Sequence, residues 1–337
     1  MDERGHLSEE FLALAGWQGA TRAPLAGDAS FRRYERLSLE GERAVLMDAP
    51  PPAEDVRPFT SIARHLHELD YSAPRILAED PQKGFLLLED LGDMTYTRAQ
   101  AEGHDPRPLY DRAVELLVDL HKKPRIISIP DGVRSYDRDL LLEEAALFSD
   151  WYMPPIIGKV TVGRLRNEYL NLWRDLLGRL DDQPDTLVLR DFHADNLMWL
   201  EDRPGIEACG LLDFQDAVCG PPAYDLMSLF EDARLDLSPQ LVGDGLGLYL
   251  DSFPELDRAE FITSYTLLAA QRHCKVIGIF TRLSVRDAKH DYLRHIPRVW
   301  RLLEKALRHP ALAPLEAWLS THLPTEARAT PVRSRQV

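Results

Sequence analysis

The sequence predicts a two-lobed α+β protein, in which a small antiparallel sheet precedes a mainly helical lobe. Three observations predict this class. Residues 34–48 alternate or run apolar as strands do, and from Leu109 onward apolar residues recur at helical spacing. A chain of 337 residues is also too long for one ordinary hydrophobic core. We therefore expect a first lobe over 1–90, a helical lobe over 91–323 and a disordered tail over 324–337.

The elements of the first lobe follow from changes in apolar period. Alternating or short apolar runs predict strands, and 3.6-residue spacing predicts helices. Ser8 is a suitable N-cap for an opening helix, and Gly41 lies in a turn between the first two strands. The expected order is helix, two strands, helix and two strands, over 8–17, 34–39, 44–47, 55–69, 74–77 and 85–88.

The second lobe is predicted as a series of amphipathic helices that strands interrupt once. Apolar runs within 187–212 predict short strands with a polar loop between them. No fixed-period repeat is present, which argues against a solenoid. The expected helices cover 109–121, 137–152, 162–180, 222–236, 238–251, 257–283, 287–308 and 313–321.

Composition restricts the possible partners. A net charge of −15 argues against a nucleic-acid backbone or an anionic membrane surface as partner. The sequence contains no apolar run long enough for a transmembrane helix and no apolar N-terminal segment typical of a signal peptide. Three cysteines without CxxC spacing indicate reduced, mostly buried thiols. We expect a cytoplasmic protein, and the oligomeric state is left open.

An Asp–Asn–Asp set lies within and after the interrupting strands. Asp191 precedes Asn196 by five residues, and Asp213 follows Asn196 by seventeen. Transfer of the γ-phosphoryl group of ATP to a hydroxyl needs a carboxylate to accept the proton and oxygen ligands for Mg²⁺. We expect Asp191 to be the catalytic base and Asn196 and Asp213 to hold Mg²⁺. Turn capping explains one such residue more readily than three at this spacing.

A second segment suits the phosphates of ATP. Small residues let backbone N–H groups approach a phosphate, and a guanidinium can hold its oxygens bidentately. The strand over 44–47, where a phosphate-binding lysine is expected, contains none. Either Arg32 or Arg33 replaces it, or nucleotide binding depends more heavily on Mg²⁺; a plain turn is the alternative. The expected nucleotide-binding residues here are Gly27, Ala29, Ser30, Phe31, Arg32 and Arg33.

Charged side chains in the second lobe are candidates for binding the acceptor. Glu231 and Arg234 are three residues apart on a predicted helix, where a solvated ion pair is the alternative. Arg272 and Lys275 interrupt an otherwise apolar helix, where unpaired polar groups would be costly. They could bind a carboxylate, an acetamido group or a hydroxyl of a substrate, or they could pack against the acidic catalytic loop.

These motifs carry a resemblance to a known family. The segments GDASFRRY, LMDAPP, LLLEDLGD, LVLRDFHADNLMWL, LLDFQDAVCGPPAYDL and AAQRHCKVIGIFTRL occur in this order between residues 27 and 283. Together they resemble the anomeric N-acetylmuramate/N-acetylglucosamine kinase family, within the aminoglycoside-phosphotransferase-like, protein-kinase-like superfamily. The sequence departs from the superfamily pattern HxDxHxxN at Leu189, where the first His would stand.

The resemblance implies a bilobal protein-kinase-like fold, ATP and Mg²⁺ as cofactors, and an amino sugar phosphorylated at its C1 hydroxyl during peptidoglycan recycling in the cytoplasm. It implies that Glu89 and Leu91 belong to an adenine-binding hinge. It also implies that Asp225 is structural and supports the catalytic loop. His193 matches the second His of the motif and is a candidate for substrate binding.

Two alternatives remain at this point. Another small-alcohol kinase of the same fold could act on an aminoglycoside, choline or homoserine, because Glu231 and Asp232 could bind a cation. A nucleotide-binding pseudokinase is the second alternative, since the lysine and the leading His are missing. The complete Asp191, Asn196 and Asp213 set argues against it, because a scaffold has no physical need for these groups.

Overall fold

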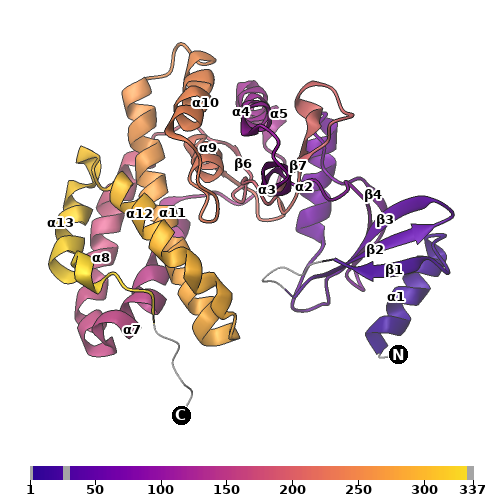
Figure 1. Cartoon of the computed structure of the whole chain (residues 1–337), viewed down its shortest axis with the longest axis horizontal. Helices are drawn as coiled ribbons and strands as arrows, with labels where there is room; N and C mark the ends of the chain where they lie inside the picture. The colour runs from indigo at the N-terminus through magenta and orange to yellow at the C-terminus, as the bar shows by residue number, and fades with distance from the viewer. Residues whose placement is uncertain (1–2, 26–30, 332–337) are drawn as a thin grey trace. The chain divides into compact units, whose positions relative to one another are not determined.

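The structure, a computed structural model, describes residues 3–25 and 31–331 and divides into two compact units (Figure 1). Unit 1 comprises Met1–Leu116 and Ala194–Ala217, and unit 2 comprises Leu117–His193 and Val218–Val337. The prediction of a small antiparallel sheet followed by mainly helical structure is confirmed. The compact units have other bounds than the lobes expected over 1–90 and 91–323, because Ala194–Ala217, with Asn196 and Asp213, belongs to unit 1 while Asp191 belongs to unit 2.

Unit 1 is built on a five-stranded antiparallel sheet with the order β1-β2-β3-β5-β4. The edge strand β1 was not predicted, because its four residues TRAP contain a proline and show no apolar alternation. The strands are β1 Thr21–Pro24, β2 Arg33–Leu39, β3 Glu42–Asp48, β4 Ile76–Asp80 and β5 Phe85–Glu89. The accompanying elements are α1 Glu3–Leu14, α2 Arg57–Glu68, α3 Tyr96–Ala101, β7 Leu197–Trp199 and β8 Cys209–Leu211, and α4 Pro106–Lys122 begins in unit 1 and ends in unit 2.

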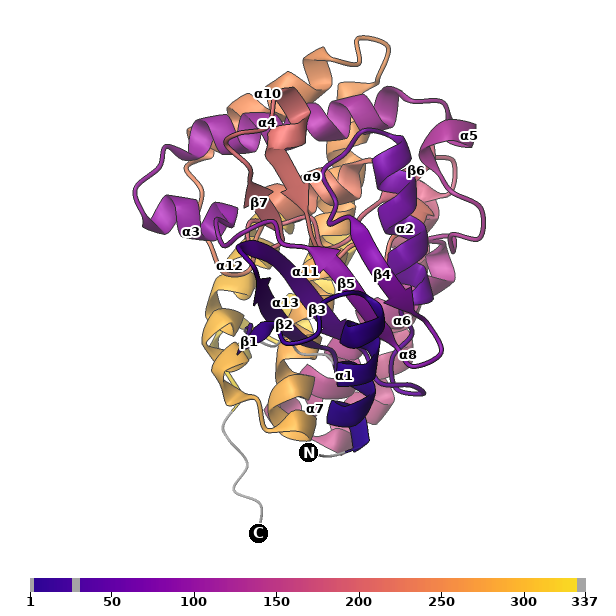
Figure 2. The ribbon, with the colours of Figure 1, turned by 90° about the vertical axis from the view of Figure 1, so that its right-hand side faces the viewer.

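One face of this sheet packs against α1, and the opposite face lines a pocket. Successive side chains of a strand point to opposite faces, and cross-strand partners share a face. Leu37 pairs with Ala44, and Leu46 pairs with Leu87. These residues form a buried core with Phe11 and Leu12 of α1, which lies along the sheet (Figure 2). The alternate residues of the same strands are therefore left to line a pocket on the opposite face.

Unit 2 is a helical assembly around the long helix α11 (orange in Figure 1), which packs against α6, α9 and α12. A two-stranded β6–β9 pair lies within the unit. Its helices are α5 Arg125–Ser128, α6 Arg138–Leu147, α7 Met153–Ile157, α8 Lys159–Leu177, α9 Ala223–Phe230, α10 Pro239–Asp251, α11 Arg258–Asp287, α12 Ile296–Ala306 and α13 Ala313–His322. Its strands are β6 Thr186–Val188 and β9 Val218–Gly220.

Three predicted helices differ from the structure. The helix expected over 137–152 changes to a π-helical turn at Phe148–Tyr152, where Gly278 of α11 approaches so closely that a Cβ would lie 2.4 Å from the backbone of Leu147. The helix expected over 222–236 ends at Phe230. The helix expected over 287–308 is divided, because Ala288 takes a left-handed φ of 55° and ends α11.

The C-terminal segment also differs from its expectation. Residues 324–331, expected to be disordered, contact the helical unit. Arg328 pairs with Glu304 at 2.6 Å, and the Tyr152 hydroxyl donates to the carbonyl of Ala329 at 2.9 Å. The three cysteines are free and buried, as predicted. In the part of the chain that the structure describes, no helix has the length and apolarity needed to cross a membrane.

Candidate active site

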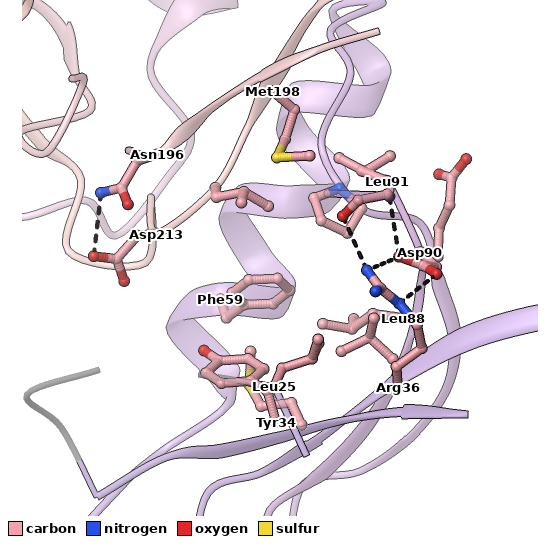
Figure 3. A pocket seen from close by; sticks show the side chains of 16 residues that line it. Leu25, Tyr34, Arg36, Phe59, Leu88, Asp90, Leu91, Asn196, Met198 and Asp213 are labelled. Carbon is pink, nitrogen blue, oxygen red and sulfur yellow. Dashed lines mark hydrogen bonds and ion pairs between the residues drawn. The ribbon is translucent and has the colours of Figure 1, made fainter. Parts of the chain in front are cut away.

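A cavity of about 270 Å³ lies on the open face of the sheet in unit 1 (Figure 3). Its walls are the alternate sheet residues Tyr34, Val45 and Leu88, with Phe59 from α2 and Met198 from β7. These side chains follow from the strand register, because Val45 pairs with Leu88 on the face opposite α1. An apolar slot of this kind can enclose a flat purine ring, while a few polar groups at its edge fix the orientation of the ring.

The segment after β5 forms one edge of this cavity. Glu89 and Leu91, expected in the hinge, both line it, together with Asp90 and Gly92. Arg36 of β2 holds this edge in place: its Nε lies 2.8 Å from Asp90 Oδ2, and its Nη2 donates to the carbonyl of Gly92 at 3.0 Å (Figure 3). Sequence reasoning missed Arg36, although its alternation with Tyr34 on one strand face could have indicated it.

Asn196 and Asp213 meet at the other end of the cavity (Figure 3). Antiparallel pairing of β7 with β8 brings them together, since the N–H of Leu212 donates to the carbonyl of Asn196 at 2.9 Å. Asn196 Nδ2 lies 3.5 Å from Asp213 Oδ2. One carboxylate and one amide give two hard oxygen donors, the usual protein contribution to a Mg²⁺ site completed by phosphate and water. This pair therefore fits Mg²⁺, once the amide presents its oxygen.

The turn that carries Asp213 is fixed from both sides. Asp213 takes a left-handed φ of 57°, which Asp tolerates better than most residues. The next residue, Phe214, is buried and stacks on Phe59 of α2 with ring centroids 4.8 Å apart. Gln215 stands where protein kinases have Gly, and its amide donates to Asp213 Oδ1 at 2.8 Å. The carboxylate is therefore held in one direction.

The structure distinguishes the two arginines expected to bind phosphate. Arg32 is largely buried, with Nη1 at 3.6 Å from Asp213 Oδ1 and Nε at 3.6 Å from Glu54 Oε2. Arg33, at the start of β2, is exposed. Phe31 is 71% exposed, and Gly27, Ala29 and Ser30 lie outside the described residues. Arg32 is therefore the arginine that lies beside Asp213 at that end of the cavity.

In unit 2, the loop after β6 that carries Asp191 is held by a buried carboxylate. Asp225 of α9 is fully buried and accepts hydrogen bonds from the N–H groups of Leu189 at 2.6 Å and Arg190 at 2.9 Å. Arg190 takes a left-handed φ of 67°, which is unfavourable for a residue with a long side chain. The contacts of Asp225 are those expected of a residue that supports the loop carrying Asp191.

Asp191 carries a negative charge that nearby cations stabilise. Arg272 Nη2 lies 3.4 Å from Asp191 Oδ1. Burial alone would raise the pKa of Asp191, but the positive charges of Arg272 and Lys275, with smaller contributions from His193 and Arg190, lower it to about 2. A carboxylate this weakly basic accepts a hydrogen bond from a hydroxyl and orients it, rather than removing the proton before transfer.

A pocket of about 130 Å³ in unit 2 contains Asp191. It combines polar groups on one side with Val276, Ile279 and Phe280 of α11 on the other. This combination suits a sugar, whose hydroxyl groups need hydrogen-bond partners and whose C–H surface packs on apolar side chains. The polar lining residues are Asp191, His193, Glu231, Asp232, Arg234, Arg272 and His273.

The carboxylates of this pocket already have cationic or hydrogen-bonding neighbours. Glu231 is buried with its Oε2 at 2.7 Å from His273 Nε2. Burial would raise the pKa of Glu231, but the hydrogen bond and positive charge of His273 lower it. His193 Nδ1 lies 4.0 Å from Asp232 Oδ2, and burial lowers the pKa of His193 despite that carboxylate. His193 is therefore neutral near pH 7, able to donate from one ring nitrogen and accept at the other.

The structure shows where four candidates for acceptor binding lie. Because α9 ends at Phe230, the expected helical pairing of Glu231 with Arg234 is wrong, although both line the pocket. Lys275 is not among the lining residues; its Nζ donates to Glu144 at 2.7 Å instead. Arg272 lines the pocket and also contacts Asp191 in the acidic loop, so the predicted packing against that loop is present and substrate binding stays a prediction.

Sequence reasoning did not select His273 as a pocket residue. Asp232 entered only as part of a cation-binding alternative. The turn after Phe230 brings Asp232 into the pocket, and no local pattern marked that turn. His273 lies between Arg272 and Cys274 on α11, and its buried partner Glu231 could have suggested a paired polar group.

Asp191 and Asp225 are expected to titrate at widely different pH values. Burial raises the pKa of Asp225 to about 7, against the lowering effect of its two backbone donors. With an unfolded pKa near 3.9, the stability contributed by Asp225 is complete below about pH 4 and is lost as the pH rises through about 7. The contribution of Asp191 has the opposite sign, being present above about pH 4 and lost toward pH 2.

Carboxyl ¹³C NMR of aspartate-labelled protein measures both titrations, with the resonances assigned from the Asp191→Asn and Asp225→Asn variants. Asp182→Asn, which changes an exposed carboxylate, provides the control for indirect shifts. If Asp191 takes up its proton above about pH 4, Arg272 and its neighbours do not hold the charge as described.

Comparison with known proteins identifies the family. A family profile described as phosphotransferase enzyme family matches residues 21–262. An N-acetylmuramate/N-acetylglucosamine kinase of Caulobacter vibrioides is 36% identical, covering 97% of this chain and 98% of its own length. A kinase of the same name from Pseudomonas aeruginosa is 38% identical over 95% of this chain and 94% of its own length.

Solved structures agree at the level of the fold. A putative aminoglycoside phosphotransferase from Ralstonia eutropha has a TM-score of 0.63 at 15% identity, over 90% of this chain and 97% of that one. A choline/ethanolamine kinase family protein from Mesorhizobium loti has a TM-score of 0.61 at 15% identity, over 94% and 99%. The predicted protein-kinase-like fold is thereby confirmed.

A nucleotide-sized cavity that ends at an Asn–Asp pair is what a phosphotransferase requires, and the two kinases are similar to this chain along almost their whole length. The protein is therefore a kinase that belongs to the phosphotransferase enzyme family and, within it, to the N-acetylmuramate/N-acetylglucosamine kinases.

Proposed function

We propose that this protein uses ATP and Mg²⁺ to phosphorylate the anomeric C1 hydroxyl of N-acetylmuramate and N-acetylglucosamine. The observation that carries the proposal is the acceptor pocket, in which the ionised Asp191 faces a mixed polar and apolar lining of sugar-binding character. The names of relatives at 36–38% identity over most of the chain support the same substrates. We further propose that the reaction serves peptidoglycan recycling in the cytoplasm, as the family resemblance implies.

The nucleotide end of the reaction is assigned to unit 1. The adenine ring would lie between Val45, Leu88 and Met198, with the segment around Glu89 and Leu91 along its edge. Asn196 and Asp213 would hold Mg²⁺, which when bound supplies positive charge to the β- and γ-phosphates. Arg32 would add a second positive charge, in the role that a lysine has in protein kinases.

The acceptor end is assigned to unit 2. Asp191 would accept the hydrogen bond of the C1 hydroxyl and so point its oxygen at the γ-phosphorus. An anomeric hydroxyl is more acidic than an ordinary alcohol, and phosphoryl transfer develops little charge on the attacking oxygen before bond formation. A base with a pKa of about 2 is then sufficient, because orientation and charge neutralisation account for most of the rate.

The charges of the pocket argue against the cationic substrates of the alternative kinases. A choline or aminoglycoside site needs carboxylates that gain a partner when the substrate binds. Here Asp191 lies against Arg272, and Glu231 lies against His273. Arg234 and Arg272 both line the pocket and would repel a cation. A neutral or anionic sugar fits this lining better.

The proposal is tested by measuring ATP consumption with a panel of acceptors and Mg²⁺ present. We expect N-acetylmuramate and N-acetylglucosamine to stimulate ATP turnover, and choline, homoserine and kanamycin to leave it at the background rate. Stimulation by one of the cationic acceptors alone would contradict the proposal. A thermal shift with ATP that increases on adding Mg²⁺, but with no turnover on any acceptor, would support the pseudokinase alternative.

Replacing Arg32 with Ala is expected to raise the Michaelis constant for ATP about tenfold, equivalent to roughly 1.4 kcal/mol. The reason is its position beside Asp213 at the metal-binding end of the cavity. Steady-state kinetics in ATP measures the change. The matched control is Arg33→Ala, because this neighbouring arginine is exposed. Equal effects of the two substitutions, or none, would show that Arg32 does not bind phosphate.

Arg234 is expected to favour N-acetylmuramate over N-acetylglucosamine. Muramate carries a lactyl carboxylate that glucosamine lacks, and an exposed guanidinium in the pocket lining can pair with it. Arg234→Gln should lower kcat/KM for N-acetylmuramate about tenfold and change the value for N-acetylglucosamine by less than about twofold. Measuring both sugars with one protein preparation provides the control. A parallel decrease for both sugars would contradict this role.

A further inference from the structure

A buried carboxylate behind the catalytic loop carries more contacts than helix packing requires. Glu144 of α6 is 7% exposed and is not among the residues lining the acceptor pocket. It accepts hydrogen bonds from Lys275 Nζ at 2.7 Å, from the Tyr136 hydroxyl at 2.5 Å and from Gln271 Nε2 at 3.3 Å. It also accepts one from the guanidinium of Arg190. Burial would raise the pKa of Glu144, but Lys275 and Arg190 lower it, so the group is ionised.

Arg190, which directly precedes Asp191, is held at every polar group of its backbone. Its N–H donates to Asp225 at 2.9 Å. Its carbonyl accepts from Ser228 Oγ at 3.1 Å and from Arg272 Nη1 at 3.2 Å. These contacts hold a left-handed conformation that an arginine seldom adopts, with φ at 67°. The bond from its side chain to Glu144 adds a fourth point of attachment.

We propose that Glu144 is a positioning residue for phosphoryl transfer. Glu144 holds the side chain of Arg190, and Arg190 fixes the backbone that directs Asp191 at the acceptor hydroxyl. The proposal rests on the function proposed above for Asp191. One helix, α11, contacts both Glu144 and Asp191. Its Lys275 donates to Glu144, and Arg272, one turn away, pairs with Asp191. A change at Glu144 is therefore transmitted through Arg190 to Asp191.

A purely structural ion pair makes a different prediction from a positioning residue. A buried pair can often be replaced by apolar side chains of similar size without loss of stability. Apolar replacement of a positioning residue lowers the rate even where the fold is retained. A displacement of about 1 Å at the reacting groups can lower the rate on the order of a hundredfold. Nucleotide binding, assigned to unit 1, would be unaffected in either case.

Three variants separate these roles. Arg190→Gly removes the side chain but suits the left-handed backbone, so the fold is retained. Arg190→Lys keeps a charge that can reach Glu144. Glu144→Met combined with Lys275→Met replaces these two side chains by apolar groups and leaves the guanidinium of Arg190 without its carboxylate. Tyr169→Phe is the control, because it removes a hydrogen bond to the carbonyl of Ala145 in the same helix without touching Arg190.

The experiment measures kcat and the Michaelis constant for ATP with the sugar that the wild-type protein phosphorylates, and thermal unfolding for every variant. We expect Arg190→Gly and the double variant to lose at least about tenfold in kcat while the Michaelis constant for ATP changes by less than about twofold. Arg190→Lys should recover part of the loss, and Tyr169→Phe should match wild type. If the double variant does not fold, the Arg190 variants decide alone.

Folded variants with kcat within about threefold of wild type would overturn the positioning role of Glu144. An equal loss in Arg190→Gly and Arg190→Lys would overturn it too, since charge at position 190 would then not matter. Failure of the wild-type protein to phosphorylate any amino sugar is a separate outcome. It would reject the proposed function before any variant is compared.

Discussion

Replacing Asp191 with Asn is expected to lower kcat at least about a hundredfold. An amide is uncharged and replaces one acceptor oxygen by an NH2 donor, so the hydrogen bond that directs the acceptor hydroxyl at the γ-phosphorus is weakened or lost. The substitution also leaves Arg272 without the carboxylate that lies 3.4 Å from it. The free energy of unfolding should therefore decrease as well, by less than the increase in the activation free energy. Nucleotide binding should not change, because the nucleotide cavity is lined by other residues.

Single-turnover kinetics measures the chemical step, and titration with ATP by calorimetry measures nucleotide affinity separately. Asp182→Asn makes the same chemical change at an exposed carboxylate of unit 2 and should leave kcat at the wild-type value. A variant at position 191 that turns over within a few-fold of wild type would remove Asp191 from the reaction. A loss of ATP affinity equal to the loss of turnover would instead assign Asp191 to nucleotide binding.

Replacing Asp213 with Asn is expected to lower kcat on the order of a hundredfold and to raise the Mg²⁺ concentration needed for half-maximal rate. Asp213 is the carboxylate of the proposed metal pair, and the remaining amide ligands bind Mg²⁺ more weakly than a carboxylate does. The same carboxylate faces Arg32, so its loss also leaves that guanidinium without its neighbour. Part of the activity should return at high Mg²⁺ concentration.

Mg²⁺ titrations of the rate at saturating ATP provide the measurement. The control is Asp216→Asn, three residues away, where the carboxylate is exposed. If Asp213→Asn has the wild-type Mg²⁺ dependence, the metal ligands must be sought elsewhere. Equal effects at 213 and 216 would indicate a general influence of negative charge, rather than coordination.

The parts of the protein that sequence predicted well are those in which the signal is local. Alternating or short apolar runs predicted four strands of the sheet, and buried residues of β2, β3 and β5 pack with α1. The spacing of Asn196 and Asp213 matched one hairpin, and the β7–β8 pairing brings their side chains to 3.5 Å. In each case the chain itself limits how far apart the groups can lie.

The parts that sequence did not predict depend on contacts between distant segments. Arg36 fixes the nucleotide cavity through Asp90, fifty-four residues away, and no local pattern links them. Lys275 was a candidate for substrate binding or for packing, and its Nζ donates to Glu144, 131 residues away. The end of α9 at Phe230, which brings Asp232 into the pocket, followed no Gly or Pro signal. The tertiary structure determines which groups pair with buried charges, and local patterns in a single sequence do not indicate these pairs.

Phosphate position in the product tests the proposed reaction most directly. The purified protein is incubated with ATP, Mg²⁺ and N-acetylglucosamine or N-acetylmuramate, and the product is characterised by two-dimensional ³¹P–¹H correlation NMR. We expect the new phosphorus resonance to couple to the anomeric proton, which places the phosphate on C1. Coupling to the C6 protons, or a phosphate on an amino alcohol but on neither sugar, would contradict an anomeric sugar kinase.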